Sequence, residues 1–429
     1  MLLLNKIYSS MLIKIKLIVT ACILLGLPVL LVAQNNSSPY SVLGIGDIET
    51  SYFNRYTGMA NAGVALFDER YINNSNAASL TKLREHFYAF EISSRFKQVV
   101  YSGANVLATA NKTTDFAIRR VNLAAKVTKN WGSSIGLMPF STASFSFNTN
   151  KNIQGTLLNV AANYEGDGGV NQFYWSNGYK LSKNTSIGVT SSFLFGSINQ
   201  TENILSSDLS TNLTTKNSIF LRNYYFNFAL QTKKKLSKTW ESTYGITYSP
   251  KTALQAQTSI DVTSNTTTEI KNAITNNNYF TLPESYNAGI AFINNNKYTF
   301  TVNAQAQNWN AVKYSGSNYQ LVNSNKLSLG FQNSQKAKNV YNTEYEKGFF
   351  QLGLYAGNSY IKMNNNQMMD YGGSIGFSRN SRNSPLGYII SLEAGKRGTR
   401  STTQLTENYF NINFTLSYLD FLFGGKKYF

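Results

Sequence analysis

Apolar side chains recur at every second position in many short segments of this chain, and this period of two limits the folds that it can adopt. Residues 121–128 (VNLAAKVT) and 224–231 (YYFNFALQ) show the pattern clearly. Successive side chains of a β-strand point to opposite faces, so a period of two predicts a strand with one apolar face. The chain is therefore expected to consist of strands that each separate an apolar environment from a polar one.

About fourteen such strands can be placed, and the connections between them alternate between long and short. Long outer loops are expected near 148–170, 197–218 and 251–283, and tight turns such as 294–296 (NNN) separate them. Only the connection between 333 and 348 breaks the alternation. The expected strands cover 86–102, 117–128, 133–147, 171–180, 186–196, 219–232, 239–250, 284–293, 297–308, 326–333, 348–356, 371–379, 387–396 and 408–418. An even strand number with long loops at one end predicts an all-β fold, a transmembrane antiparallel β-barrel.

Mean hydropathy favours a barrel over a bundle of membrane helices. The value is −0.25, although 42% of the residues are hydrophobic and 14% are aromatic. Strands that alternate lipid-facing and lumen-facing residues give a membrane protein such a polar average. The 28 tyrosines and 27 phenylalanines fit a lipid-facing surface bordered by aromatic girdles.

The first 33 residues have the features of a signal peptide. Lys6, Lys14 and Lys16 form a basic start, residues 17–32 are almost wholly apolar, and Ala33 is a small residue at a cleavage point. This apolar run is shorter than the ~20 residues that a membrane helix needs. The predicted organisation is a signal peptide at 1–33, an N-terminal plug or hatch at 34–85 and a transmembrane barrel at 86–429.

Two alternatives concern this leader. Met11 could be the true start, and residues 19–22 (VTAC) resemble a lipoprotein cleavage box, although the apolar run continues beyond Cys22. Cys22 is the only cysteine, so a mature chain that begins at Gln34 contains none. Disulfides, a catalytic cysteine and thiolate metal sites are then excluded.

The chain is basic, with a formal net charge of +18. Without the three leader lysines, 36 Lys and Arg residues stand against 21 Asp and Glu residues. The basic residues are scattered and no groove-reading motif occurs, so nucleic acid is not an expected partner. Membrane lipids and anionic lipopolysaccharide are the expected partners of such a surface.

The sequence offers little for catalysis or for binding a cofactor or metal. Its one histidine, His86, lies at the predicted junction of hatch and barrel, and neither a zinc-protease motif nor a phosphate-binding loop occurs. We therefore expect no enzyme activity, no cofactor and no metal. The acid of most interest is Glu393, which the period of two places on the lumen side, where it could pair with a basic residue.

Short motifs resemble the FadL/TodX (OmpP1) family of outer-membrane transport proteins. Residues 58–65 (GMANAGVA) lead into 74–80 (NSNAASL), much as a glycine-and-alanine block leads into an Asn-Pro-Ala-x-Leu motif in that family's hatch. Residues 136–141 (GLMPFS) and 282–289 (LPESYNAG) are similar to motifs of its barrel. The candidate hatch residues are Gly58, Gly63, Asn76, Ala77, Ala78 and Leu80, with Ala77 in the place of the family's proline.

The resemblance implies a 14-stranded barrel plugged by its N-terminus. It also implies that hydrophobic compounds leave sideways into the membrane, through a gap at a kink in the third strand. Proline removes a donor from the strand ladder and glycine weakens a strand. The candidate lateral opening is therefore Gly136, Met138, Pro139 and Phe140; a bulge beside a short turn is the other interpretation.

Two functions follow, both in the bacterial outer membrane. One is passive uptake of hydrophobic small molecules or lipids. The other is a non-transporting subunit of an outer-membrane complex for protein secretion or β-barrel assembly. A mostly apolar, continuous lumen lined by Phe and Leu favours the first. A sealed lumen, with an apolar patch outside the lipid belt or on the loops, favours the second. Phe429, the aromatic C-terminus, is a candidate signal to the barrel-assembly machinery during biogenesis.

Overall fold

A computed structural model describes most of the chain after the predicted leader. It covers residues 38–103, 111–152, 159–205, 212–264, 267–312, 319–338, 344–363, 365–381, 384–399 and 404–421. The predicted signal peptide and Phe429 lie outside these residues. Within them, no helix is long and apolar enough to cross a membrane.

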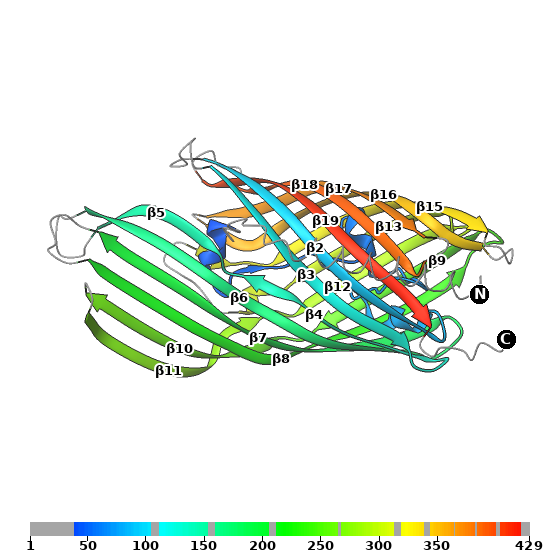
Figure 1. Ribbon diagram of the computed structural model, residues 1–429, viewed down its shortest axis with the longest axis horizontal. Helices are drawn as coiled ribbons and strands as arrows, with labels where there is room; N and C mark the ends of the chain where they lie inside the picture. Colours follow the sequence, from blue (N-terminus) through cyan, green and yellow to red (C-terminus); the bar gives the residue numbers. More distant parts are fainter. Residues whose placement is uncertain are drawn as a thin grey trace, which may run out of the picture. The chain divides into compact units, whose positions relative to one another are not determined.

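The described chain forms an antiparallel β-barrel that closes where β19 pairs with β2 (Figure 1). The wall has fourteen strands when four collinear pairs (β4 with β5, β9 with β10, β11 with β12, β14 with β15) each count once. The short β1 (Asp47–Ile48) pairs with β4 from inside. The wall segments are β2 (Phe87–Ser102), β3 (Lys112–Lys126), β4 (Trp131–Thr142), β5 (Phe145–Asn152), β6 (Asn159–Lys180), β7 (Thr185–Leu205), β8 (Leu213–Lys235), β9 (Trp240–Ser249), β10 (Thr252–Ser264), β11 (Thr267–Leu282), β12 (Ser285–Asn294), β13 (Tyr298–Gln307), β14 (Tyr319–Leu321), β15 (Ser324–Lys338), β16 (Glu344–Met363), β17 (Asn366–Asn380), β18 (Leu386–Gly398) and β19 (Thr406–Phe421).

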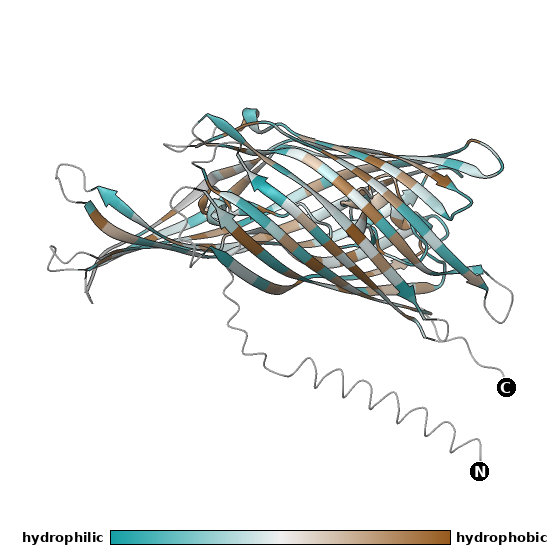
Figure 2. Cartoon of the chain, turned by 90° about the horizontal axis from the view of Figure 1, so that it is seen from above, coloured by the Kyte–Doolittle hydropathy of each residue, from teal (hydrophilic) through white to brown (hydrophobic). Residues whose placement is uncertain are grey.

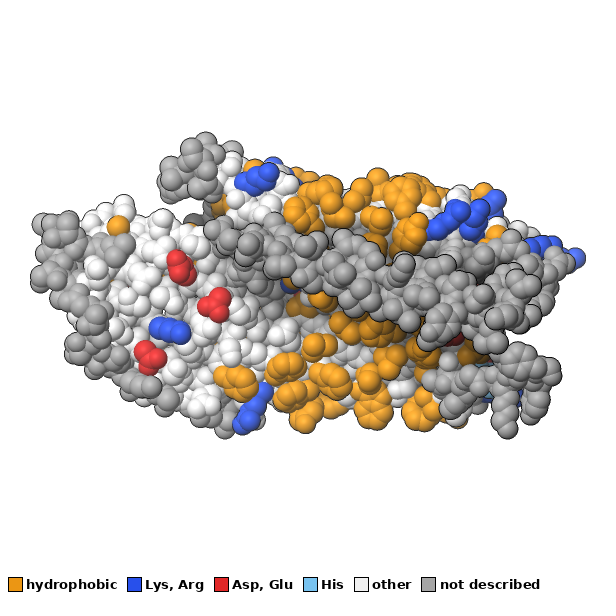
Figure 3. All heavy atoms as spheres, viewed as in Figure 1, with side chains coloured by type: hydrophobic (Ala, Val, Ile, Leu, Met, Phe, Trp, Pro, Cys, Tyr) orange, Lys and Arg blue, Asp and Glu red, His pale blue; other side chains and the backbone are white. Residues whose placement is uncertain are grey.

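An outward-facing belt of apolar side chains surrounds the barrel. Ile118, Tyr224 and Leu354 are 63%, 62% and 63% exposed, which an aqueous surface would not favour. Apolar and polar residues alternate along the strands (Figure 2), and apolar side chains gather over the barrel in the space-filling view (Figure 3). This belt is the surface that a bilayer would cover, which confirms the predicted fold class.

The strands beyond this belt are longer than the sequence predicted. The three expected outer loops at 148–170, 197–218 and 251–283 are largely strands, because the hairpins β5–β6, β7–β8 and β10–β11 continue outward. They form a sheet that extends past the rest of the wall (Figure 1, left), termed here the projection. Its outer surface is mostly polar (Figure 3). Water on both faces removes the alternation that a lipid-facing strand must show, so the pattern ends before the strand does.

The exception in the predicted loop pattern also has a simple cause. β15 runs to Lys338 and β16 begins at Glu344, and the two pair antiparallel at their ends. The connection expected between 333 and 348 is therefore a tight one, as the alternation of long and short connections requires.

The N-terminal residues 38–85, termed the hatch segment, lie inside the barrel and contain little regular structure. Three short 3-10 helices occur in it: η1 (Pro39–Val42), η2 (Arg55–Met59) and η3 (Ala77–Lys82); a fourth, η4 (Trp309–Ala311), follows β13. Asn54 and Asn76 cap η2 and η3, since each side chain accepts a hydrogen bond from the backbone two residues later. Most of the segment from Phe53 to Leu83 is buried.

Candidate functional site: the barrel interior

Eight glycines on the inner face of the wall lie against the hatch segment, and they are termed here the glycine arc. They are Gly132, Gly178, Gly188, Gly245, Gly289, Gly330, Gly353 and Gly376. Several are directly paired across neighbouring strands, as Gly178 is with Gly132 and with Gly188. Residues paired in this way point to the same face, so the arc leaves part of the wall without side chains.

The hatch backbone occupies the space that these glycines leave. A Cβ atom on Gly188 would lie 2.4 Å from the backbone nitrogen of Ala78, and one on Gly245 would lie 2.1 Å from the carbonyl oxygen of Val64. Both distances are far below a van der Waals contact, so these positions accept only hydrogen. Backbone therefore packs directly on backbone, which leaves no channel along this contact.

The predicted hatch residues are brought together in this contact. A Cβ on Gly58 would lie 2.5 Å from the Cα of Gly376, and Gly63 lies against the ring of Tyr56. Asn76 donates a hydrogen bond to the carbonyl of Val64 (2.7 Å) and so ties the two hatch motifs to each other. These contacts describe packing and show no binding chemistry.

Ala77, Ala78 and Leu80 complete the hatch set. Ala77 and Ala78 lie against Gly178 and Gly188, and the carbonyl of Leu80 lies against Gly132. Ala77 is the first residue of η3, a position at which proline is also tolerated, so its replacement of the family's proline requires no change of fold.

The opposite part of the inner wall is polar, and it is termed here the polar arc. It is formed by β18, β19, β2 and β3 and carries the buried side chains Ser391, Asn411, Asn413, Thr415, Ser417, Glu91, Ser93, Arg95, Arg120 and Asn122. Arg120 forms a wholly buried ion pair with Glu91, and Glu91 also accepts a hydrogen bond from the backbone of Ile72 (3.0 Å). This arc therefore holds the hatch segment by charge and hydrogen bonding.

Further ion pairs fix other parts of the hatch segment. Arg95 pairs with Glu49 at 2.9 Å, and Arg397 with Asp47 at 2.7 Å. Arg55 pairs with Asp68 of the hatch segment and, at 2.7 Å, with Glu346 of the wall. These guanidinium groups and carboxylates are largely withdrawn from water. Separating the hatch segment from the wall would therefore leave charges buried without a partner, which is costly.

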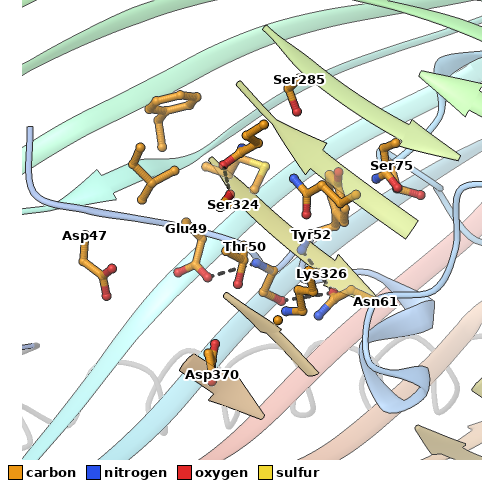
Figure 4. A pocket seen from close by; sticks show the side chains of 18 of the residues that line it. Asp47, Glu49, Thr50, Tyr52, Asn61, Ser75, Ser285, Ser324, Lys326 and Asp370 are labelled. Carbon is orange, nitrogen blue, oxygen red and sulfur yellow. Dashed lines mark hydrogen bonds between the residues drawn. The ribbon is translucent and has the colours of Figure 1, made fainter. Parts of the chain in front are cut away.

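A cavity of about 300 Å³ lies inside the barrel, beside the hatch segment (Figure 4). It is lined mainly by polar and charged side chains, among them Asp47, Glu49, Asp370, Lys326 and Arg397. A pocket for a hydrophobic compound is expected to be lined predominantly by apolar and aromatic side chains. This lining is suited to water or a polar group instead.

Glu393 lies on the wall of this cavity. It accepts hydrogen bonds from the hydroxyl of Tyr355 (3.0 Å) and from the side-chain amide of Asn411 (3.1 Å). Tyr409, whose hydroxyl lies next to that of Tyr355, donates to Asp370 at 2.7 Å. The basic partner expected from the sequence is replaced, among the described residues, by this tyrosine and amide network.

An apolar cluster fills the interior next to the projection. Its buried members are Ile45, Ala143, Val170, Leu194, Ile198, Ile219, Leu221, Leu254, Ala256, Phe280, Leu282, Trp309, Val312 and Leu321. Trp309 of η4 stacks on Tyr360 with ring centroids 4.5 Å apart. The chain's own side chains therefore occupy apolar space at this level of the barrel, where a lipophilic ligand would need room.

The four residues of the candidate lateral opening lie where two wall strands separate. β4 pairs with β3 only as far as Leu137, opposite Val121, whereas β3 continues along β2 to Lys112. Beyond this point β4 keeps its pairing with β6, and Asp47 and Ile48 of β1 pair with its end. The hatch segment thus takes the place of β3 beside β4.

These four side chains face different surroundings. Gly136 is in the last paired stretch, where a Cβ would meet the Tyr174 hydroxyl at 2.4 Å. Met138 is buried against Phe53 and Tyr174, and Phe140 packs on Tyr225. Pro139 keeps a partner in β6, and the register shifts directly after it. The sequence did not indicate the pairing of β1, since two residues carry no strand pattern.

The glycine arc was also missed from the sequence, although a signal was present. Isolated glycines inside strand patterns often mark a close approach of another backbone. Each of the eight lies within a strand. That they all contact the hatch segment follows only from the cross-strand register.

Comparison with known proteins supplies a family and a fold. A family model described as BamG matches residues 12–429. Comparison with curated protein sequences gives no match. None of these results concerns a particular residue of the interior.

Several solved structures share the fold at low sequence identity. The CymD monoaromatic hydrocarbon channel has a TM-score of 0.55 at 14% identity, covering 88% of this chain and 98% of its own. A Pseudomonas aeruginosa FadL homologue gives 0.54 at 12% identity, with 86% and 98% covered. The toluene transporter TodX of Pseudomonas putida gives 0.52 at 13%, with 82% and 93% covered. The resemblance to the FadL/TodX proteins is thus confirmed for the fold.

Proposed function

This chain belongs to the BamG family, and we propose from that premise that it is a structural subunit of an outer-membrane complex that assembles β-barrel proteins. The observation that carries the proposal is the filling of the barrel by its own chain. The hatch segment packs backbone to backbone on the glycine arc and is ion-paired elsewhere. The cavity that remains is lined mainly by polar side chains, and the chain's own residues fill the apolar space beside the projection. This interior supports a scaffold with an outer surface for partners better than a conduit for apolar compounds.

The location and partners follow from this role. The apolar belt and the predicted signal peptide support the bacterial outer membrane, with membrane lipids and lipopolysaccharide around the barrel. Phe429 remains a candidate signal for the barrel's own assembly. The protein partner would be a component of the barrel-assembly machinery.

Depletion of the protein from its own cells tests the role. Depleted cells are expected to lose other outer-membrane barrels, measured by quantitative proteomics of the membrane. Unchanged barrel levels together with impaired uptake of a lipophilic compound would contradict the proposal.

A locked hatch makes this experiment sharper. The hydroxyls of Thr81 in η3 and Ser186 in β7 lie 2.9 Å apart, so Thr81→Cys with Ser186→Cys places two thiols within bonding reach. The oxidised double variant is expected to restore barrel levels in depleted cells as well as the reduced variant does. Failure only in the oxidised form would mean that the hatch must move.

A second candidate, passive uptake of hydrophobic compounds with lateral exit, is favoured by the separation of β3 from β4. The buried pair Arg119–Asp115 on β3 lies along the unpaired part of that strand, which disfavours an apolar cargo there. If the opening is used, Pro139→Val should lower uptake of a lipophilic probe by restoring a continuous strand. Under the scaffold proposal, uptake is unchanged, and Ser133→Val on the same strand serves as the matched control.

A further inference from the structure

Three tight turns at the same end of the barrel share one sequence pattern. Residues 126–130 (KVTKN), 180–184 (KLSKN) and 235–239 (KLSKT) each contain lysine, an aliphatic residue, a hydroxyl residue and a second lysine. They connect β3 to β4, β6 to β7 and β8 to β9, and so follow one another around the rim. Tight turns lie at the periplasmic end of bacterial outer-membrane barrels.

The three turns also have one structure. The backbone N–H of Val127, Leu181 and Leu236 donates to the carbonyl four residues later, at 2.8, 3.0 and 2.9 Å. In each turn the hydroxyl residue accepts hydrogen bonds from backbone N–H groups two and three residues ahead. A repeated local fold therefore presents the same two kinds of side chain three times.

The aliphatic residue of each turn faces the membrane. Val127, Leu181 and Leu236 are 48%, 58% and 50% exposed. Each lies an even number of positions after an exposed apolar residue of the preceding strand, as Leu181 lies two after Tyr179. Residues spaced in this way share one face, so all three aliphatic side chains point to the lipid side. They extend the apolar belt to the level where headgroups begin.

The surroundings of these turns are strongly basic. Eight lysines lie on the turns and their flanks: Lys126, Lys129, Lys180, Lys183, Lys233, Lys234, Lys235 and Lys238. Lys82, at the end of η3, lies near them. Two acids pair with these lysines, Glu241 of β9 with Lys233 and Glu85 of the hatch segment with Lys126, at 3.0 Å each. Burial lowers the pKa of Lys82, and the nearby charges of Lys233 and Lys180 lower it further.

We propose that these three turns bind anionic phospholipid headgroups in the periplasmic leaflet of the membrane. An aliphatic side chain at the acyl boundary beside an ammonium group at the phosphate level matches one lipid molecule on both its apolar and its charged parts. A soluble acidic protein would be matched by the lysines alone and would leave the outward aliphatic residues without a purpose. The site depends on the barrel fold and is independent of the proposed scaffold role.

The test uses the full mature protein in vesicles of phosphatidylethanolamine with a small fraction of spin-labelled lipid. Electron spin resonance measures the preference of the barrel for labelled phosphatidylglycerol over labelled phosphatidylcholine. The wild type is expected to prefer phosphatidylglycerol, and this preference should fall as salt is added. The triple variant Lys129→Gln, Lys183→Gln and Lys238→Gln should lose about fivefold or more of it.

A matched control removes the same charge from the other end. Lys112, Lys216 and Lys396 are exposed and lie away from the turns, so their triple Gln variant should keep the wild-type preference. Equal preference in the wild type and the turn variant would overturn the proposal. Loss of a copurifying acidic protein with unchanged lipid preference would overturn it as well and assign the turns to a protein partner.

Discussion

The hatch segment meets the barrel wall in two different ways on its two sides. Against the glycine arc, it packs by shape, with backbone on backbone and hardly any side chain between. Against the polar arc, it is held by the ion pair of Glu49 with Arg95 and by a hydrogen bond from the Ile72 backbone to Glu91, which Arg120 of the wall neutralises. Close backbone packing is disrupted by a larger side chain, whereas a buried ion pair is disrupted when one charged side chain is removed. The two sides of the hatch segment should therefore respond to opposite kinds of substitution, larger residues on the glycine arc and smaller or uncharged residues on the polar arc.

The largest effect is expected from removing the wall residue that neutralises Glu91, the carboxylate to which the hatch backbone donates. Arg120→Ala leaves the buried Glu91 carboxylate without its ion-pair partner, which costs about 3–5 kcal/mol of stability. Chemical unfolding of the detergent-solubilised barrel measures this loss. The double variant Glu91→Leu with Arg120→Met should recover most of it, because neither charge is then buried alone. A double variant less stable than Arg120→Ala would show that the pair itself supplies net stability.

A smaller loss is expected from adding one methyl group to the shape side. Gly188→Ala places a Cβ 2.4 Å from the Ala78 nitrogen and should cost about 1–3 kcal/mol in the same unfolding assay. Gly373→Ala is the matched control, since its Cβ would meet no atom closer than 3.3 Å. If both substitutions have the same effect, the glycine arc is not a packing surface for the hatch.

The smallest effect is expected at a polar-arc side chain that forms no hydrogen bond among the described residues. The amide of Asn413 is buried and has no hydrogen-bond partner among the described residues, so Asn413→Leu should change stability by less than about 1 kcal/mol. Asn76→Leu is the comparison, because it removes the cap of η3 and the bond to Val64 and should cost about 2 kcal/mol or more. Equal losses at the two sites would show that Asn413 is held by partners of its own.

The sequence predicted the membrane part of the fold well and the rest less well. Lipid on one face forces alternation, so segments such as 121–128 identified strands and their order. Beyond the belt, residues 199–203 (NQTEN) and 214–218 (TTKNS) are strands with polar residues on both faces, and no pattern distinguishes them from loops. The period of two therefore indicates which part of a strand faces lipid, and it does not indicate where the strand ends.

The interior could be predicted only in part for a related reason. Period-two alternation was enough to place Glu393 toward the lumen, since it needs only the strand that carries the residue. Its partners Tyr355 and Asn411 come from two other strands, and their meeting depends on cross-strand register. The glycine arc depends on the register of many strands at once, so its members looked like unrelated single glycines.

The central claim is that this filled barrel acts as a subunit of an assembly complex. Native mass spectrometry of the tagged protein, extracted from its own membrane in mild detergent, tests it most directly. The account predicts a stoichiometric complex with one or more components of the barrel-assembly machinery and no bound lipophilic cargo. A lone barrel that carries a hydrophobic small molecule would contradict it.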